Sequence, residues 1–391
     1  MTKGRRSNDG LPRAVTILTH EFYPKVGGIG LYVEETARAL AHLGSRVCVW
    51  CPWAEELEGR DFPFDIHPVR MRGTQDWDSR LLLIRALLSQ VAQWRSSVVY
   101  LAEPGPIRAW QYLQYLPFLK PRRLVVTLHG TELEHLTRCW HRRATLRHLL
   151  CSADRVGTVS RYVHERMLST YPELGEHAVI AHGAVRSGLR SPMAVRDQAN
   201  QASLSAGRAE KVRLLTLGRL HPRKGQLAVV EALGQLPPTV REHVQYRVLG
   251  PVVKKNYAQS VREAAQRHQV DMVLTGELQD EQVASELDQA DVFVMTSVPA
   301  RHSIEGFGLV YLEAGFRGLP VVAHDIGGVA DAVVNEETGL LVALDDRAAL
   351  ATALTRLIES AELRQQMGKA GRRRARLFDW ESTARKLFAN L

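Results

Sequence analysis

The sequence predicts an α/β protein made of two doubly wound domains, each built on a parallel sheet. Short apolar runs alternate with helical patterns along the chain, and the alternation stops in one polar stretch and then starts again. Alternating strands and helices are typical of parallel sheets that are covered by helices on both faces. With 391 residues, the chain has room for two to three domains of ordinary size.

The first domain is predicted to span residues 1–190. Residues 14–19 are a buried strand, a glycine-rich turn follows at 27–30, and a helical pattern over 31–43 leads to a strand at 47–50. This order of elements is a β-α-β unit. Further strands are predicted at 98–101, 124–128, 155–159 and 178–180.

The second domain is predicted over residues 212–378. Residues 186–211 are rich in Ser, Ala, Gln, Asn and Arg and have no apolar periodicity, and we place a linker at 191–211. Residues 379–391 form an amphipathic helix. Two such domains in tandem predict a cleft to which each contributes the C-terminal ends of its strands. The strands of this domain are predicted at 212–217, 246–249, 273–274, 292–295 and 321–323.

The composition excludes several classes of protein. Hydrophobic residues make up 45% of the chain and charged residues 24%, which is not the balance of a disordered protein. No apolar run approaches the ~18 residues that a membrane-spanning helix needs. Residues 1–13 are polar and basic and have no apolar core, so they do not form a signal peptide. We therefore expect a cytoplasmic protein.

The net charge of +9 is concentrated in the first half of the chain. Residues 1–190 contain 26 Lys and Arg against 18 Asp and Glu, whereas the remainder is almost balanced. A basic domain suggests an anionic partner, such as an acidic membrane surface, a phosphorylated substrate or a nucleic acid. Nucleic acid is disfavoured, because the chain has no helix-turn-helix, RNP or zinc pattern and no stacking platform among its basic residues.

No metal site is predicted. Asp76 and Asp78 form a D-x-D, but they precede a helical pattern, where aspartates are ordinary N-caps. Cys48 and Cys51 form a C-x-x-C inside a predicted strand, where residues three apart point to opposite faces.

Two glycine-containing loops are candidates for binding a phosphate. Gly27 and Gly28 lie between a strand and a helix, where the backbone can approach a ligand and the helix N-terminus offers free N–H groups. The loop 218–225, G-R-L-H-P-R-K-G, follows the first strand of the second domain. Its Arg219 and Lys224 could converge on one anionic group, and they suit a diphosphate.

The segment E-G-F-G-L-V-Y-L-E-A at 305–314 is the most informative motif. If a helix begins near Leu309, then Glu313 lies one turn into it and Glu305 lies in the preceding loop. The N–H groups of residues 307–310 would then point out of the helix N-terminus, which favours an anion. Glu313 could bind a ribose diol. In the first domain, His129 follows the strand 124–128 and could hydrogen-bond a sugar.

Together and in this order, these sites resemble the retaining GT-B glycosyltransferases of family four, in which two Rossmann-like domains face each other across a cleft. The resemblance covers nearly the whole chain and depends most on the motifs at 218–225 and 305–314. The segment 299–301, with Glu305 to Glu313 and Gly327-Gly328, is similar to the phosphatidylinositol mannosyltransferase branch.

The resemblance implies a nucleotide-diphosphate sugar donor, no metal and no other cofactor. It implies catalytic roles for four residues: His129 at the transferred sugar, Arg219 and Lys224 at the donor diphosphate, and Glu305 at the sugar hydroxyls. The helix 379–391 is implied to pack back on the first domain. Implied donor-binding residues are Gly27, Gly28, Gly218, Gly276, Leu278, Phe307, Gly308, Leu309, Val310 and Glu313, with Glu313 at the ribose.

The acceptor is expected on the basic first domain and is predicted to be anionic, either lipid-linked or a glycan. The helical pattern 77–94 carries leucines together with Arg80 and Arg85. It could lie against an anionic membrane at the inner face of the cell or pack on the sheet, and the two are not exclusive. GDP-mannose is the donor that the mannosyltransferase branch implies. The alternatives are a UDP-sugar with a soluble acceptor, and a non-catalytic nucleotide-sugar or nucleic-acid binder.

Overall fold

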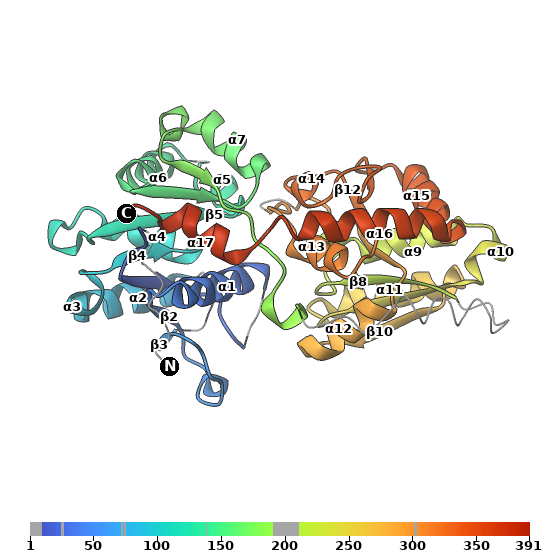
Figure 1. The fold of residues 1–391 in the computed structure, drawn as a ribbon, viewed down its shortest axis with the longest axis horizontal. Helices are drawn as coiled ribbons and strands as arrows, with labels where there is room; N and C mark the ends of the chain where they lie inside the picture. Colours follow the sequence, from blue (N-terminus) through green and yellow to red (C-terminus); the bar gives the residue numbers. More distant parts are fainter. Residues whose placement is uncertain are drawn as a thin grey trace, which may run out of the picture. The chain divides into compact units, whose positions relative to one another are not determined.

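The computed structural model describes residues 10–24, 27–71, 73, 76–137, 139–190, 211–300 and 303–391. The chain divides into two compact units. The first comprises Met1–Gly183 together with Asp379–Leu391, and the second comprises Ala184–Phe378 (Figure 1). Most of the predicted linker 191–211 lies outside the described residues.

The first unit contains a parallel sheet of seven strands in the order β3-β2-β1-β4-β5-β6-β7. Val15 pairs with Val47 on one side of β1 and with Val98 on the other. The strand order therefore reverses between β1 and β4, and ligands of doubly wound folds bind at such a point. The strands are β1 (Ala14–Leu18), β2 (Arg46–Pro52), β3 (Asp65–Val69), β4 (Val98–Leu101), β5 (Arg123–Leu128), β6 (Arg155–Thr158) and β7 (Ala178–Ile180).

Helix α17 (Trp380–Phe388) follows the second unit in sequence but packs on the first, beside α1 (Gly28–His42) (Figure 1). Trp380 meets Tyr32 edge to face at 5.2 Å, and Phe388 meets Tyr100 in the same way at 5.2 Å. The other helices of this unit are α2 (Trp77–Ser89), α3 (Val91–Trp94), α4 (Pro104–Leu113), α5 (Thr131–Leu136), α6 (Trp140–Ser152) and α7 (Arg161–Thr170), with 3-10 turns η1 (Glu55–Leu57), η2 (Pro117–Leu119) and η3 (Pro172–Leu174).

The second unit contains a parallel sheet of six strands in the order β10-β9-β8-β11-β12-β13. Its central strand β11 is a continuous apolar run that is buried throughout, as expected for a sheet that is buried on both faces. The strands are β8 (Val212–Leu217), β9 (Val244–Leu249), β10 (Met272–Gly276), β11 (Val292–Met295), β12 (Val321–His324) and β13 (Gly339–Val342).

Helices α13 (Leu309–Phe316) and α16 (Ala361–Ala375) of the second unit approach each other closely through glycines. A Cβ atom on Gly315 would lie only 3.2 Å from the carbonyl oxygen of Gly371. The remaining helices are α9 (Gln226–Gly234), α10 (Pro238–Arg241), α11 (Lys255–Arg267), α12 (Asp280–Gln289), α14 (Val329–Ala332) and α15 (Arg347–Glu359), with 3-10 turns η4 (Ser187–Leu189) and η5 (Pro222–Lys224).

The predicted fold class is confirmed, because both sheets are parallel and are connected through helices. The strands β3 and β13 were not predicted, and each lies at the edge of its sheet. The helical pattern 77–94 is two helices, since the backbone leaves helical geometry at Gln90.

Candidate active site

The loop between β8 and α9 is shaped by a glycine. Gly225 has φ of +72°, and a Cβ atom there would collide with the backbone of Thr296 at the end of β11. Only glycine fits both conditions. The turn η5 therefore holds Lys224 directly above the C-terminal ends of β8 and β11.

Lys224 and Glu305 form an ion pair at this edge of the sheet. The Lys224 Nζ lies 2.8 Å from Glu305 Oε2, and the Ser297 hydroxyl donates to the same oxygen at 3.0 Å. Burial alone would raise the pKa of Glu305, but Lys224, Arg223 and the Ser297 hydroxyl together bring this pKa below its usual range. Glu305 is therefore ionised at neutral pH. The ammonium group has three N–H donors, so Lys224 keeps donors for a further anion.

Positive charge is concentrated around the loop between β8 and α9. The pKa of His221 is lowered by burial and then by Arg219, Arg223, Lys254 and Lys224, in that order. Four cations within electrostatic range of one imidazole produce a local field that favours a polyanion. Lys254, just before α11, was not singled out by the sequence.

The loop that carries Glu305 is fixed by the Gly327-Gly328 turn. The Gly328 N–H donates to the Glu305 carbonyl at 2.9 Å, and Gly327 has φ of +53° where a side chain would strike that carbonyl. The backbone position of Glu305 therefore depends on two glycines that lie after β12.

Helix α13 begins at Leu309, as predicted. Its N-cap, Gly308, has φ of +84°, and a Cβ atom there would collide with the ring of Tyr311. The first-turn N–H groups of a helix have no acceptor within it, so Leu309 and Val310 present donors to a ligand. Phe307 just before the helix is buried and lies 5.9 Å from Phe378, ring to ring.

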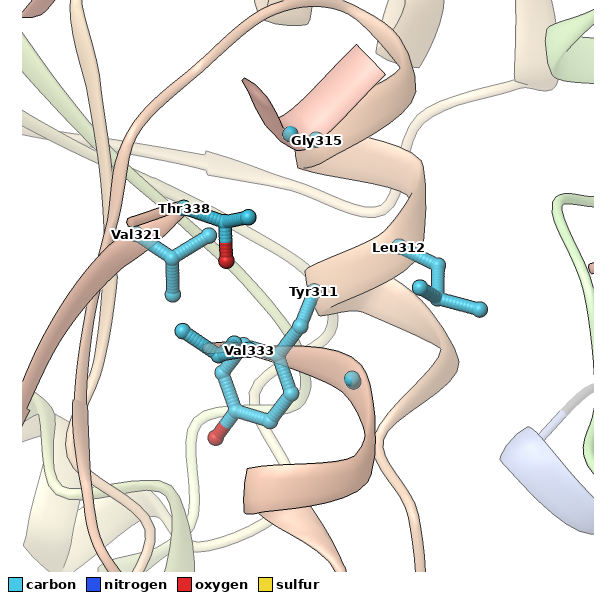
Figure 2. A pocket seen from close by; sticks show the side chains of 8 residues that line it. Tyr311, Leu312, Gly315, Val321, Val333 and Thr338 are labelled. Carbon is cyan, nitrogen blue, oxygen red and sulfur yellow. The ribbon is translucent and has the colours of Figure 1, made fainter. Parts of the chain in front are cut away.

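The opposite side of α13 has no room for a ligand. A cavity of about 10 Å³ is lined by residues that include Tyr311, Gly315 and Val333 (Figure 2). Such a volume holds one water molecule at most. This face of α13 is therefore filled by side chains of the same unit, so a ligand would contact the helix elsewhere.

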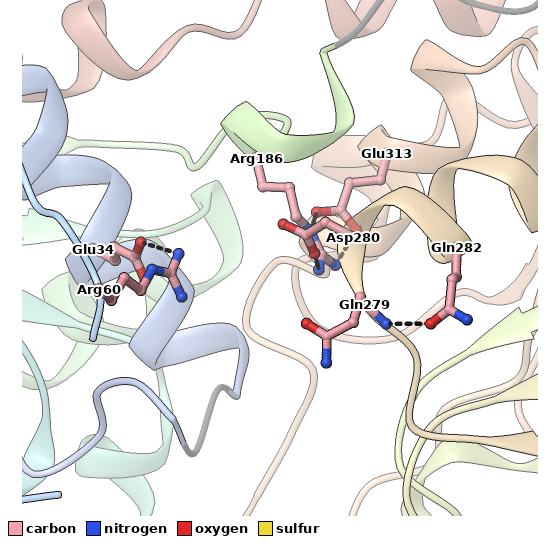
Figure 3. Close-up of polar contacts among 7 residues, drawn as sticks. All are labelled: Glu34, Arg60, Arg186, Gln279, Asp280, Gln282 and Glu313. Atoms are coloured by element: carbon pink, nitrogen blue, oxygen red, sulfur yellow. Dashed lines mark hydrogen bonds and ion pairs between the residues drawn. The ribbon is translucent and has the colours of Figure 1, made fainter. Parts of the chain in front are cut away.

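Glu313 is fully buried and lies against Arg186 rather than pointing into solvent (Figure 3). The Arg186 Nε and Nη2 donate to its two oxygens at 2.7 and 2.8 Å, and Nη1 donates to Asp280 at 3.1 Å. A ribose that hydrogen-bonds Glu313 must therefore share this carboxylate with Arg186. No sequence motif marked Arg186, which lies in the polar stretch that follows β7.

The end of β10 leaves open space beside the backbone. Gly276 has φ of +78°, and a Cβ atom there would have no neighbour within 4 Å. Leu278 follows, half-buried, just before the capping box of α12, in which the Gln279 N–H donates to the Gln282 side chain at 3.0 Å (Figure 3). A Cβ atom on Gly218, which follows β8, would make only ordinary van der Waals contacts.

In the first unit, Gly28 opens α1 and Gly27 is its N-cap. A Cβ atom on Gly28 would meet nothing within 4 Å, so the packing of the unit does not itself require glycine there. Since packing does not require glycine at position 28, the missing side chain is consistent with a ligand that approaches the backbone there. Lys25 and Val26 of this turn lie outside the described residues.

His129 lies directly after β5 and is held from two sides. Its Nε2 hydrogen-bonds the Ala102 carbonyl at 2.9 Å, and its ring meets Tyr32 edge to face at 5.2 Å. Burial lowers the pKa of His129 to about 4, so the ring is neutral at pH 7. With Nε2 donating to the carbonyl, Nδ1 is left as an acceptor for a hydroxyl group.

Two further residues at this edge were missed by the sequence analysis. His20 follows β1, and its Nδ1 lies 3.1 Å from the buried Glu103, which follows β4. The His20 Nε2 is buried without a hydrogen-bond partner in the described part of the chain. These residues lack a motif and are brought together only by the pairing of β1 with β4.

We predict that Glu132 makes stability depend on pH. Its carboxylate accepts from the His129 N–H, and burial raises its pKa to about 7 from 4.5. The folded state holds this proton more tightly than the unfolded chain does. The stabilising contribution is therefore complete below about pH 4.5 and is lost as the pH rises through 7.

The test compares Glu132→Gln with the wild type by urea unfolding at pH 4.5 and pH 8. Glutamine does not titrate, so the unfolding free energy of the variant relative to the wild type should rise by about 3 kcal/mol over this range. The exposed Glu165→Gln is the control and should show a constant difference. A constant difference for Glu132→Gln as well would contradict the prediction.

Asp76 of the D-x-D has the N-cap role that was predicted for it, and Asp78 lies in the first turn of the same helix. The Asp76 side chain accepts from the Ser79 N–H at 2.8 Å and caps α2. Among the described residues, no group of three His, Cys, Asp or Glu is arranged to hold a metal ion.

The two sheets and the loops at their C-terminal edges define a GT-B, nucleotide-sugar-dependent transferase. Residues 26–185 match the family model described as Glycosyltransferase Family 4, and residues 200–374 match the model described as Glycosyl transferases group 1. The chain belongs to this family of glycosyltransferases, and the predicted family and enzyme class are confirmed.

Relatives and solved structures match this chain over almost its full length. A GDP-mannose-dependent α-(1-6)-phosphatidylinositol monomannoside mannosyltransferase of Mycolicibacterium smegmatis is 29% identical over 93% of this chain and 94% of its own. The sucrose-phosphate synthase of Thermosynechococcus elongatus has a TM-score of 0.76 at 22% identity, covering 95% of this chain and 96% of its own. Anabaena HepE in complex with UDP and glucose has a TM-score of 0.73 at 19% identity, covering 95% and 97%.

Proposed function

We propose that this protein is a retaining, metal-independent mannosyltransferase that uses GDP-mannose and an anionic, lipid-linked acceptor. The observation that carries the proposal is the ion pair between Lys224 and Glu305 at the centre of a strongly basic loop cluster. A cation already held by a carboxylate is preorganised for the diphosphate of a nucleotide sugar. The choice of mannose and of a phosphatidylinositol-type acceptor is supported by the 29% identical mannosyltransferase.

Each predicted donor contact has a chemical role. Arg219, Lys224 and the first-turn N–H groups of α13 would neutralise the diphosphate, while Gly27 and Gly28 would let the backbone approach it. Glu305 would accept from the mannose hydroxyls. The remaining donor positions, near the base, the ribose or the backbone of the donor, are Gly218, Gly276, Leu278, Phe307, Gly308, Leu309, Val310 and Glu313.

The proposed reaction exchanges one bond at the anomeric carbon. The bond from this carbon to the diphosphate breaks, and its electron pair goes to the phosphate oxygen, whose negative charge Arg219 and Lys224 stabilise. The acceptor oxygen forms the new bond on the same face and passes its proton to the departing phosphate. This front-face route requires no carboxylate nucleophile, and the configuration is retained.

An apolar exposed surface supports a lipid acceptor and peripheral membrane contact. On α2, Leu81, Leu82 and Leu88 are exposed, so this helix does not bury all of its apolar side chains on the sheet. The exposed cation Arg85 lies on the same helix. Apolar and cationic side chains together suit the surface of an anionic membrane. No helix in the described residues is long and apolar enough to cross a bilayer.

The test is nucleoside diphosphate release from a panel of GDP- and UDP-sugars in EDTA, with and without phosphatidylinositol vesicles. We expect release from GDP-mannose that the vesicles stimulate, and a product in which the α-configuration of the donor is kept. Release from a UDP-sugar with a soluble acceptor would favour the alternative that Anabaena HepE illustrates with UDP. Absence of release from every donor would contradict the proposal and favour a binding protein.

A further inference from the structure

The first unit contains a cavity of about 460 Å³ that none of the predicted roles uses. This volume is in the range of small-molecule sites. Its wall comes from α2, α4, α5 and α6, and α5 begins directly after His129 and Gly130. The α5 residues in this wall are His135 and Leu136, so the cavity lies at the C-terminal end of this six-residue helix, and the strand end where the transferred sugar is expected lies at its N-terminal end. Its lining residues include three arginines and three aromatic residues: Arg80, Arg108, Arg142, Trp77, Tyr112 and Tyr115.

Three arginines line this cavity from three different helices. Arg80 is only 9% exposed, and its guanidinium lies 4.3 Å from the centre of the Trp77 ring. Arg108 is half-buried, and Arg142 is exposed on α6. The pKa of Arg108 is lowered by burial and then by Arg80, with a further contribution from Arg142, so the three charges interact.

These arginines have no ion-pair partner in the part of the chain that the structure describes. The acidic groups nearby have other partners. Asp76 caps α2, Glu103 accepts from the Gly105 N–H at 2.9 Å, and Glu132 accepts from the His129 N–H. Glu103 and Glu132 offset part of the charge on Arg108, and Asp76 and the Tyr112 hydroxyl offset part of the charge on Arg80. Three converging cations that are not fully compensated form a site for an anion.

The mouth of the cavity is aromatic and apolar. Trp77, Tyr112 and Tyr115 line it and are each more than half exposed. Trp77 and Tyr112 contact each other with ring centres 6.2 Å apart. Leu116 and Phe118, which follow Tyr115 in sequence, are also exposed. An anion that binds among the arginines would therefore carry an apolar or sugar-like substituent at the mouth.

We propose that Arg80, Arg108 and Arg142 bind the phosphate ester of the acceptor in this cavity. The inference rests on the proposed function, since it names the group through which the anionic acceptor is held. Guanidinium groups suit this role, because each can donate two parallel hydrogen bonds to phosphate oxygens. The Trp77 ring holds the Arg80 guanidinium in place, so less side-chain freedom is lost on binding.

The experiment measures binding of three probes: vesicles of phosphatidylcholine with phosphatidylinositol, soluble glycerophosphoinositol, and inorganic phosphate. Arg108→Gln and Arg142→Gln should weaken binding of the first two probes roughly ten- to hundredfold. Arg142 is exposed, so its replacement leaves the fold intact where that of Arg80 could disturb it. Tight binding of the vesicles alone identifies a lipid, and equal binding of the soluble ester identifies a phosphorylated small molecule.

The matched control is Arg143→Gln, which removes an exposed cation from α6 outside the cavity wall. It should change binding by less than about twofold. Equal losses for Arg143→Gln and Arg142→Gln would overturn the proposal in favour of diffuse attraction to anionic surfaces. Unchanged binding in both cavity variants would also overturn it. GDP binding on the same preparations reports the donor site separately, so its failure would count against the proposed function and not against the cavity.

Discussion

Replacing Lys224 by alanine should slow nucleoside diphosphate release about 10²- to 10³-fold, the cost of removing one preorganised donor to developing charge. Lys224 is held by Glu305 at 2.8 Å and lies in the basic cluster around His221. The loss should appear mainly in kcat, because charge on the leaving diphosphate grows as the bond to the sugar breaks. The measurement is steady-state release with the donor that the panel identifies.

Lys255→Ala is the matched control, since it removes an exposed lysine at the start of α11 in the same unit. Its activity should stay within about twofold of the wild type, because Lys255 is exposed and screened and is not among the four cations that lower the pKa of His221. The unfolding midpoint of both variants is recorded to detect a loss of fold. An Lys224→Ala enzyme that is folded and retains more than a tenth of its activity would contradict the role given to this residue.

Replacing Arg186 by methionine should lower the free energy of unfolding by about 3–5 kcal/mol, the range for breaking a buried ion pair. The variant leaves the fully buried Glu313 carboxylate without its two hydrogen bonds of 2.7 and 2.8 Å. Asp280, the other partner of Arg186, is substantially exposed and can turn to water. Urea unfolding monitored on the second unit measures the effect.

Two further variants distinguish the cost of leaving Glu313 charged and buried without a partner from the cost of losing the Arg186 side chain itself. Arg186→Met combined with Glu313→Leu should recover most of the stability, because an apolar pair can replace a buried ion pair. Arg356→Met breaks a similar two-bond pair with Glu336 at the surface and should cost less than about 1 kcal/mol. Equal losses of unfolding free energy for Arg186→Met and Arg356→Met would contradict the prediction. They would show that Arg186→Met does not leave Glu313 as an unpaired buried charge.

Central strands could be predicted from the sequence, whereas two of the four edge strands, β3 and β13, could not. Residues 98–101 and 292–295 are apolar throughout because both faces of a central parallel strand are buried, and their bounds agree with the structure. The edge strand β3 instead contains Asp65 and Pro68. Proline is tolerated at an edge, where its missing N–H is not needed, but it removes the apolar signal that predicts a strand.

Candidate site residues could be predicted from the sequence where they lie next to a glycine with positive φ. They could not be predicted where packing brings them into contact. The motifs at 218–225 and 305–314 are recognisable because Gly225 and Gly308 need positive φ next to Lys224 and Glu305. By contrast, Ser297 reaches Glu305 only because β11 ends beside that loop, and Arg186 reaches Glu313 across 127 positions of sequence. Such pairings follow from strand order and packing, which local patterns do not encode.

The return of α17 to the first unit has a consequence for the order in which the protein is made. Trp380 and Phe388 pack against Tyr32 and Tyr100, so the core of the first unit includes side chains that are translated after residues 184–378. The second unit is continuous in sequence and can complete its folding as soon as Phe378 has left the ribosome. On the ribosome, therefore, the unit that is synthesised first is the one that is finished last.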